Sequence, residues 1–194
     1  MFTALLDTNV LWPSAQRDFL LSLGFEGVYR PIWSDAVLDE LQFHEARKLT
    51  SRGVGEADAE CRAAHLIARM RSSFGDAIVV GWERLEGSYG LPDPNDEHVV
   101  AAAELGGAGA IVTLNLKDFP ADRIPTSIRV LPPAAFALEQ ASLNPPAAMR
   151  AVDQLAARSG AHGPSRSADD ILDLLDARYG MADAVEVIRA AARP

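Results

Sequence analysis

The stretch Phe2-Thr-Ala-Leu-Leu-Asp7-Thr-Asn9 decides how this chain folds, because a short uncharged run ends abruptly in polar side chains. The run from Phe2 to Leu6 predicts a buried strand. Asp7 follows at the carboxyl end of that strand. The stretch therefore predicts a strand that presents a carboxylate at the edge of a sheet.

Short apolar runs recur along the chain and alternate with helical patterns. Further strands are predicted at 29–33, 77–80, 110–113 and 128–131. Helices are predicted at 13–24, 34–48, 56–74 and 93–106. This alternation is typical of a parallel sheet covered by helices on both faces. We therefore predict an α/β fold with a parallel sheet of about five strands.

The pattern of predicted elements changes after Pro133, where no further strand is predicted. The helical patterns beyond it lie at 134–140, 146–158, 168–178 and 181–192. Ser167 and Asp170 have the spacing of a capping box, and 159–165 has the composition of a linker. We therefore predict one domain over residues 1–134 and a helical C-terminal extension over residues 135–194.

The composition is that of an ordinary globular protein and limits the possible functions. The chain has 194 residues, of which 48% are hydrophobic and 23% charged. Its single cysteine, Cys61, excludes an internal disulfide and zinc sites built from cysteine pairs. We expect a cytoplasmic protein without a membrane span or an export signal, because no long apolar run is present. The net charge of −9 argues by itself against nucleic-acid binding.

Carboxylates stand where the predicted strands end. Asp7 and Asp118 follow strands, and Asp96 falls in the first turn of a predicted helix. In open parallel sheets, ligands bind outside the carboxyl ends of the strands. Glu40 borders the apolar face of its predicted helix, where a carboxylate is costly unless it has a partner. Oxygen ligands without cysteine or paired histidine favour Mg²⁺ or Mn²⁺, which activate water and neutralise an attacked phosphodiester.

Each of these acids also fits an ordinary structural role. Asp93 has the position of a helix cap, and Asp96 would favour the helix dipole. Asp7 and Asp118 are compatible with turns, and Glu40 with a solvated helix face. Their combination in this order is what makes a shared site the better hypothesis.

Four motifs in order carry a resemblance to a known family. They are Leu5–Val10, Trp33–Glu40, Leu91–Ala102 and Ile111–Pro120. The chain resembles PIN-domain ribonucleases over about residues 1–134, and in particular the toxin component of VapBC-type toxin–antitoxin pairs. The helical tail is similar to one found in a subgroup of such toxins.

The resemblance implies a Mg²⁺-dependent endoribonuclease, with Mn²⁺ as a substitute. The residues it implies are catalytic Asp7, Glu40, Asp96 and Asp118, metal ligands Asp7, Asp96 and Asp118, and supporting Asn9, Thr113, Asn115 and Asp93. Asn95 departs from the family pattern, because many members carry another acid there, which leaves the part played by Asp93 open. The partners implied are an RNA substrate, a small cognate antitoxin and a second copy of the chain.

Two other functions are compatible with an acidic α/β site. One is a structure-specific DNA nuclease. The other is a phospho-acceptor signalling module, which would need an acceptor aspartate after a middle strand, whereas Gly81 and Trp82 follow the predicted strand 77–80.

Side chains that would contact RNA are harder to predict. Basic residues gather around the third predicted helix and could track a phosphate backbone, or could equally be a solvated face: Arg47, Lys48, Arg52, Arg62, Arg69 and Arg71. Four aromatic residues could stack on bases, although packing in the core or in loops is the expectation: Trp12, Trp33, Trp82 and Tyr89. His98 follows Asp96 by two residues, so on a continuous helix it is predicted to point away from the site.

Overall fold

The computed structural model describes residues 1–160 and 164–191, and its contacts group these residues into two compact units. The first unit consists of residues 3–12 and 31–130. The second consists of residues 1–2, 13–30 and 131–194. Residues 161–163 of the predicted linker lie outside the described part of the chain.

The sheet is five-stranded, as the sequence predicts. Its strands are β1 (Thr3–Leu6), β2 (Arg30–Ser34), β3 (Ile78–Val79), β4 (Ala110–Val112) and β5 (Arg129–Leu131). Their order is β3-β2-β1-β4-β5, and the β1–β4 and β2–β3 pairs are parallel. In the β1–β4 pair, Leu6 is opposite Val112. Because β1 is the central strand, Asp7 leaves the sheet at the middle of its carboxyl edge.

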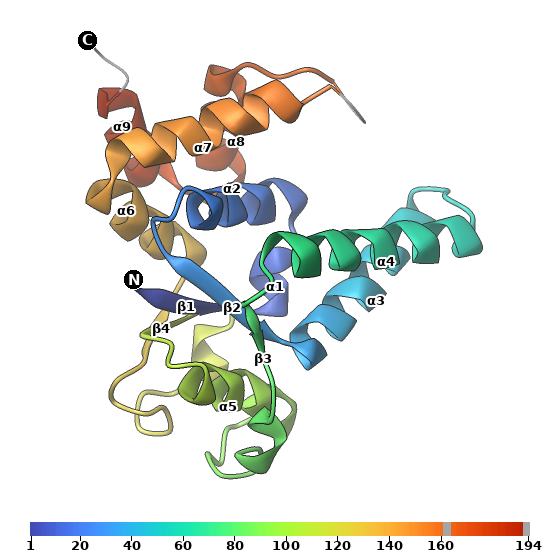
Figure 1. Ribbon diagram of the computed structural model, residues 1–194, viewed down its shortest axis with the longest axis vertical. Coiled ribbons are helices and arrows are strands. Elements are labelled where there is room, and N and C mark those ends of the chain that lie inside the picture. Colours follow the sequence, from blue (N-terminus) through green and yellow to red (C-terminus); the bar gives the residue numbers. More distant parts are fainter. Residues whose placement is uncertain (161–163, 192–194) are drawn as a thin grey trace. The chain divides into compact units, whose positions relative to one another are not determined.

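One face of the sheet is covered by α5 (Glu97–Leu105), which packs against β1 and β4 (Figure 1). Leu5, Ile111 and Val99 belong to one buried cluster there. The predicted helix over 93–106 is in fact a 3-10 turn, η2 (Pro94–Asp96), followed by α5. Asp96 lies in the first turn after the Asp93 cap and Pro94, as predicted, but that turn is 3-10 rather than α-helical.

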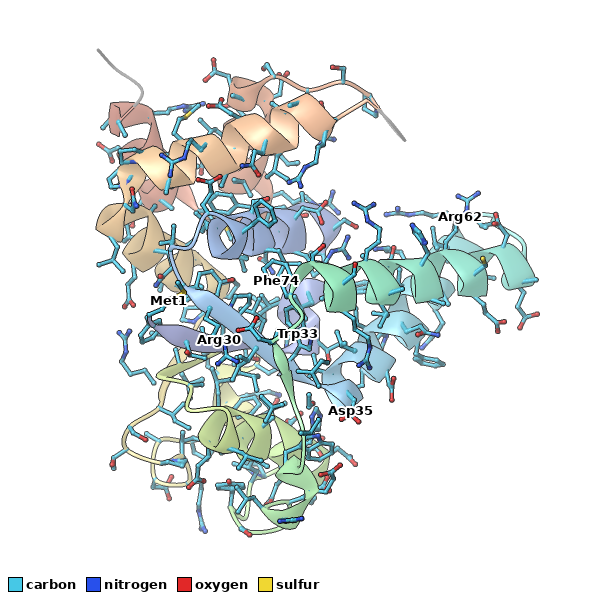
Figure 2. The ribbon with its side chains drawn as sticks, in the orientation of Figure 1. Met1, Arg30, Trp33, Asp35, Arg62 and Phe74 are labelled. Atoms are coloured by element: carbon cyan, nitrogen blue, oxygen red, sulfur yellow. The ribbon has the colours of Figure 1, made fainter. Side chains whose placement is uncertain are left out.

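The remaining helices of the first unit are α1 (Thr8–Leu11), which the sequence did not predict, α3 (Asp35–Ser51) and α4 (Glu56–Ser73). Helices α3 and α4 pack side by side as a long helical pair (Figure 1). At the base of this pair the Trp33 ring meets the Phe74 ring edge-on at 5.7 Å, and Arg62 lies far out along α4 (Figure 2). Ser34 caps α3 by accepting the Val37 N–H at 3.1 Å, as predicted.

The second unit is helical. It contains α2 (Ser14–Phe25), α6 (Pro133–Leu143), α7 (Pro145–Arg158), α8 (Ala168–Tyr179) and α9 (Ala182–Ala191). Helix α2 packs against α7, and Glu26 just after α2 accepts the Arg150 Nε–H at 2.6 Å. The predicted capping box of Ser167 and Asp170 is confirmed at the start of α8. The sequence did not predict that α2 would pack with the C-terminal helices, and the domain boundary at residue 134 stays a prediction.

Within the described residues, no helix is long and apolar enough to span a membrane.

Gly106 ends α5 at a point where the helix approaches the sheet closely. A Cβ atom there would lie 2.4 Å from Ile32 Cδ1, 2.8 Å from Val79 Cγ2 and 2.9 Å from the Ala102 carbonyl oxygen. We expect Gly106→Ala to lower the free energy of unfolding by about 1–3 kcal/mol, the usual cost of overpacking. Gly75→Ala is the matched control, because a Cβ there meets nothing within 4 Å. Equal urea midpoints for the two variants would contradict the close approach.

Candidate active site

Asp7 is held at the end of β1 by two side chains from distant parts of the sequence. The Thr113 hydroxyl donates to Asp7 Oδ2 at 2.7 Å, and the Asn9 amide donates to the same oxygen. Asn9 also donates to Thr113 Oγ1 at 3.0 Å and accepts the Leu114 N–H at 2.9 Å. Asn115 reaches this network through its backbone N–H, which donates to Thr113 Oγ1 at 3.0 Å. The structure thus brings Asn9, Thr113 and Asn115 together at Asp7.

Asp7 is the most buried of the candidate acids, with 7% of its surface exposed. Burial raises the pKa of its carboxyl above the ordinary value, and the negative charge of Glu40 raises it further. The hydrogen bond from Thr113 opposes this shift. The ionised form of Asp7 is therefore disfavoured by its surroundings, and a nearby cation would relieve that cost.

Glu40 lies beside Asp7 on the second turn of α3 and has two partners. The Thr8 hydroxyl donates to Glu40 Oε2 at 2.7 Å, and His98 Nε2 lies 3.4 Å from Oε1. Burial raises the pKa of Glu40, but the hydrogen bonds from His98 and Thr8 and the charge of His98 together hold it below its ordinary value. Glu40 is thus an ionised and oriented carboxylate.

His98 belongs to this site, so the prediction that it points away is wrong. The side chain is buried, and its Nδ1 lies 3.5 Å from Ser34 Oγ. The prediction assumed about 100° of rotation per residue between positions 96 and 98. That rotation separates His98 from Asp96, but the site also includes Glu40 on α3, and His98 reaches it from α5.

Asp96 lies within the electric field of the other aspartates. Burial raises its pKa to about 6, and the negative charges of Asp7, Asp93 and Asp118 contribute to the shift. Asp93 is the predicted cap, since its carboxylate accepts the Asn95 N–H at 2.9 Å. Asp118 ends the 3-10 turn η3 (Leu116–Asp118) after β4. Asp7, Asp93 and Asp118 are therefore close enough to Asp96 for their negative charges to act on it.

Glu97 is a buried acid whose role the sequence analysis missed. Its Oε1 accepts the N–H groups of Gly90 at 2.7 Å and Leu91 at 3.2 Å, and its Oε2 accepts that of Tyr89 at 3.3 Å. Burial raises its pKa, and the backbone hydrogen bonds lower it by more. These bonds fix the segment that leads into Asp93. The available signal was an acid two residues before the apolar run 99–103.

The donor set suits a hard divalent cation. Among the described residues, no three histidine, cysteine or acidic side chains form a ready-made metal cage. Mg²⁺ does not need one, because it is usually bound through one or two carboxylates and keeps several waters. Asp7 and Asp96, both with raised pKa values, are the carboxylates that gain most from a positive charge.

The raised pKa of Asp96 makes the stability of the metal-free protein depend on pH. The folded state holds this proton up to about pH 6, whereas the unfolded chain releases it near the ordinary aspartate pKa of 3.8. The folded state therefore binds more protons in this window, and stability falls as the pH rises from about 4 to 6. We expect a loss on the order of 1 kcal/mol after solvent screening. Urea unfolding in chelator should show this fall for the wild type and a smaller one for Asp96→Asn; parallel curves would contradict it.

The fold and site together define an α/β domain with an acidic site at the carboxyl edge of a parallel sheet. The family model for the PIN domain matches residues 3–117, and the chain belongs to this family, which is generally a nuclease fold. The match includes Asp7, Glu40 and Asp96 and ends one residue before Asp118. No curated protein and no solved structure matched the chain.

Proposed function

We propose that this PIN-domain protein is a metal-dependent endoribonuclease that acts as the toxin of a toxin–antitoxin pair. The observation that supports it best is that burial and the negative charges of Asp7, Asp93 and Asp118 raise the pKa of Asp96 to about 6. Such mutual repulsion is costly in a structural cluster and useful in a site for a cation and a phosphodiester. The choice of RNA, and the toxin role, rest on the resemblance of the four sequence motifs.

In this proposal, Asp7, Asp96 and Asp118 would hold Mg²⁺ or Mn²⁺, which would supply neutralisation of charge on the attacked phosphate and activation of water. Asn9 and Thr113 keep the Asp7 carboxylate in one orientation. Glu40, fixed by Thr8 and His98, orients the attacking water. Its lowered pKa suits a group that accepts a hydrogen bond and remains ionised, rather than a base that keeps the proton. His98 is a positioning residue that acts through Glu40.

The absence of an aspartate after strand 77–80 does not exclude the phospho-acceptor alternative. In the structure β3 is an edge strand, so the residues after it say nothing about a middle-strand acceptor. The central strand is β1, which Asp7 follows, but membership of the PIN-domain family favours a nuclease. The DNA-nuclease alternative is separated by experiment.

A toxin must be restrained, and we propose that a small antitoxin inserts a lysine or arginine into the acidic site. An anionic cluster would bind such a side chain by charge-assisted hydrogen bonds. We also propose a homodimer, from the family resemblance alone. Co-expression with the product of the adjacent reading frame tests the first proposal by co-purification and by relief of toxicity.

The test of the nuclease proposal is cleavage of matched single-stranded RNA and DNA oligonucleotides with Mg²⁺, with Mn²⁺ and with chelator. RNA should be cleaved with either metal, and chelator should abolish cleavage. Preferential DNA cleavage would replace the proposal by the DNA-nuclease alternative. Labelling by acetyl phosphate without cleavage of either strand would favour the phospho-acceptor.

A further inference from the structure

Helix α1 follows Asp7 and packs against α3, which carries Glu40, and Trp12 is the residue that ends α1 as its C-cap. The Thr8 hydroxyl bonds to Glu40 at 2.7 Å, and the Trp12 indole N–H donates to the His44 carbonyl at 3.3 Å. Trp12 and His44 each lie four residues after the first pair, which is about one helical turn, or 5.4 Å. The second pair is therefore one turn away from the candidate active site.

Around this second pair lies what we call the aromatic patch, formed by Trp12, Phe43, His44, Arg47 and Lys48. Trp12 is 43% exposed and Phe43 59% exposed. The His44 ring lies 6.3 Å from the Trp12 ring and 5.5 Å from the Phe43 ring. Arg47 lies over Phe43 at 5.5 Å, and Lys48 lies 5.9 Å from the Trp12 ring. Two accessible aromatic rings are thus flanked by cations.

The charges of the patch differ from those of the acidic site. Lys48 is paired with Glu45 inside the helix. Arg47 is exposed, and no carboxylate of the described chain forms an ion pair with it. In a protein with a net charge of −9, this is a local positive feature beside exposed rings. A ligand with a flat aromatic face and a negative charge would be complementary to both the exposed rings and the charge of Arg47.

We propose that the aromatic patch binds a nucleobase of single-stranded RNA next to the phosphodiester at the acidic site. Bases of any sequence stack on aromatic side chains, and arginine adds attraction for the ring and for phosphate. The proposal rests on the proposed ribonuclease function and adds the residues that hold the substrate. It also gives the exposed Trp12 side chain a role in binding, which packing alone does not explain.

The chain offers a direct reporter for this contact. Of its three tryptophans, Trp33 is fully buried and Trp82 is 8% exposed, so Trp12 is the accessible one. Single-stranded RNA added in chelator, where no cleavage occurs, should quench the emission of the wild type. Trp12→Phe should lose the quench and keep binding within a few-fold by fluorescence anisotropy of labelled RNA. Trp12→Ala should bind about 5- to 150-fold more weakly, as expected for one lost stack.

Phe43→Ala should also weaken binding, whereas Phe25→Ala should not. Phe25 is the matched control, because it is a 67% exposed phenylalanine that is not part of the patch. RNA binding without a quench, and with equal affinity in Trp12→Ala, overturns the inference. If Phe43→Ala loses a co-purified protein partner and keeps the RNA quench of Trp12, the assignment to stacking by Trp12 stands and a second ligand is added. If the patch variants lose the partner and RNA binding is unaffected in every variant, the inference is overturned.

The outcome is separable from that of the ribonuclease proposal. If the protein cleaves RNA and the patch variants have the same RNA affinity and the same KM as the wild type, only the stacking inference is overturned. A Trp12-dependent RNA quench in a protein that cleaves no RNA overturns only the ribonuclease proposal. Asp96→Asn should keep the quench, since Asp96 is not part of the patch.

Discussion

Asp96→Asn is expected to reduce RNA cleavage by about 10²-fold or more, the scale of losing an electrostatic stabiliser or a metal ligand. Asparagine keeps the shape of the side chain and removes the charge. The raised pKa of Asp96 places this carboxylate in the field of the other three aspartates, where a cation contributes most. Asp7→Asn and Asp118→Asn should have effects of the same order. Initial rates at saturating Mn²⁺ measure all three.

Two control variants separate the loss of a site carboxylate from the loss of a carboxylate elsewhere. Asp58→Asn removes an exposed carboxylate on α4 that is paired with Arg62 at 2.8 Å, and it should leave the rate unchanged. Asp93→Asn should cost much less than Asp96→Asn, because Asp93 bonds to the Asn95 backbone as a cap. A loss for Asp93→Asn equal to that for Asp96→Asn would show that the assignment in this turn is wrong.

The second large effect concerns metal and stability. The wild type should gain about 2.7 kcal/mol of unfolding free energy at a hundredfold excess of Mg²⁺ or Mn²⁺ over the dissociation constant. Asp7→Asn should gain little, because a principal ligand is lost. In chelator the variant should equal the wild type or exceed it by about 1 kcal/mol, since the raised pKa of Asp7 indicates that its charge is unfavourable there.

Thermal melts in chelator and in millimolar Mn²⁺ separate this result from an ordinary structural role. The asparagine carbonyl can still accept the bonds from Thr113 and Asn9, so the local network is retained. A purely structural Asp7 would lose the same stability with and without metal. Equal metal-dependent shifts in the wild type and Asp7→Asn would exclude Asp7 as a ligand.

Much of the fold could be predicted from local sequence. Short apolar runs produced the five strands, and Ser34, Asp93 and Ser167 are the caps that their positions indicate. These features depend on neighbours within a few residues, so spacing suffices to find them. The prediction that Asp7, Asp96 and Asp118 share one site also rests on local information, because strand ends of a parallel sheet share one edge.

The sequence by itself determined the α/β class, the parallel sheet and the acids at its carboxyl edge. Only the tertiary structure decided that β1 is central, that α2 packs with the C-terminal helices, and that His98 reaches Glu40. It also decided that Trp12 is exposed one turn beyond the acids, whereas Trp33 is buried. The physical reason is that strand order, helix docking and side-chain exposure depend on contacts between residues far apart in the chain.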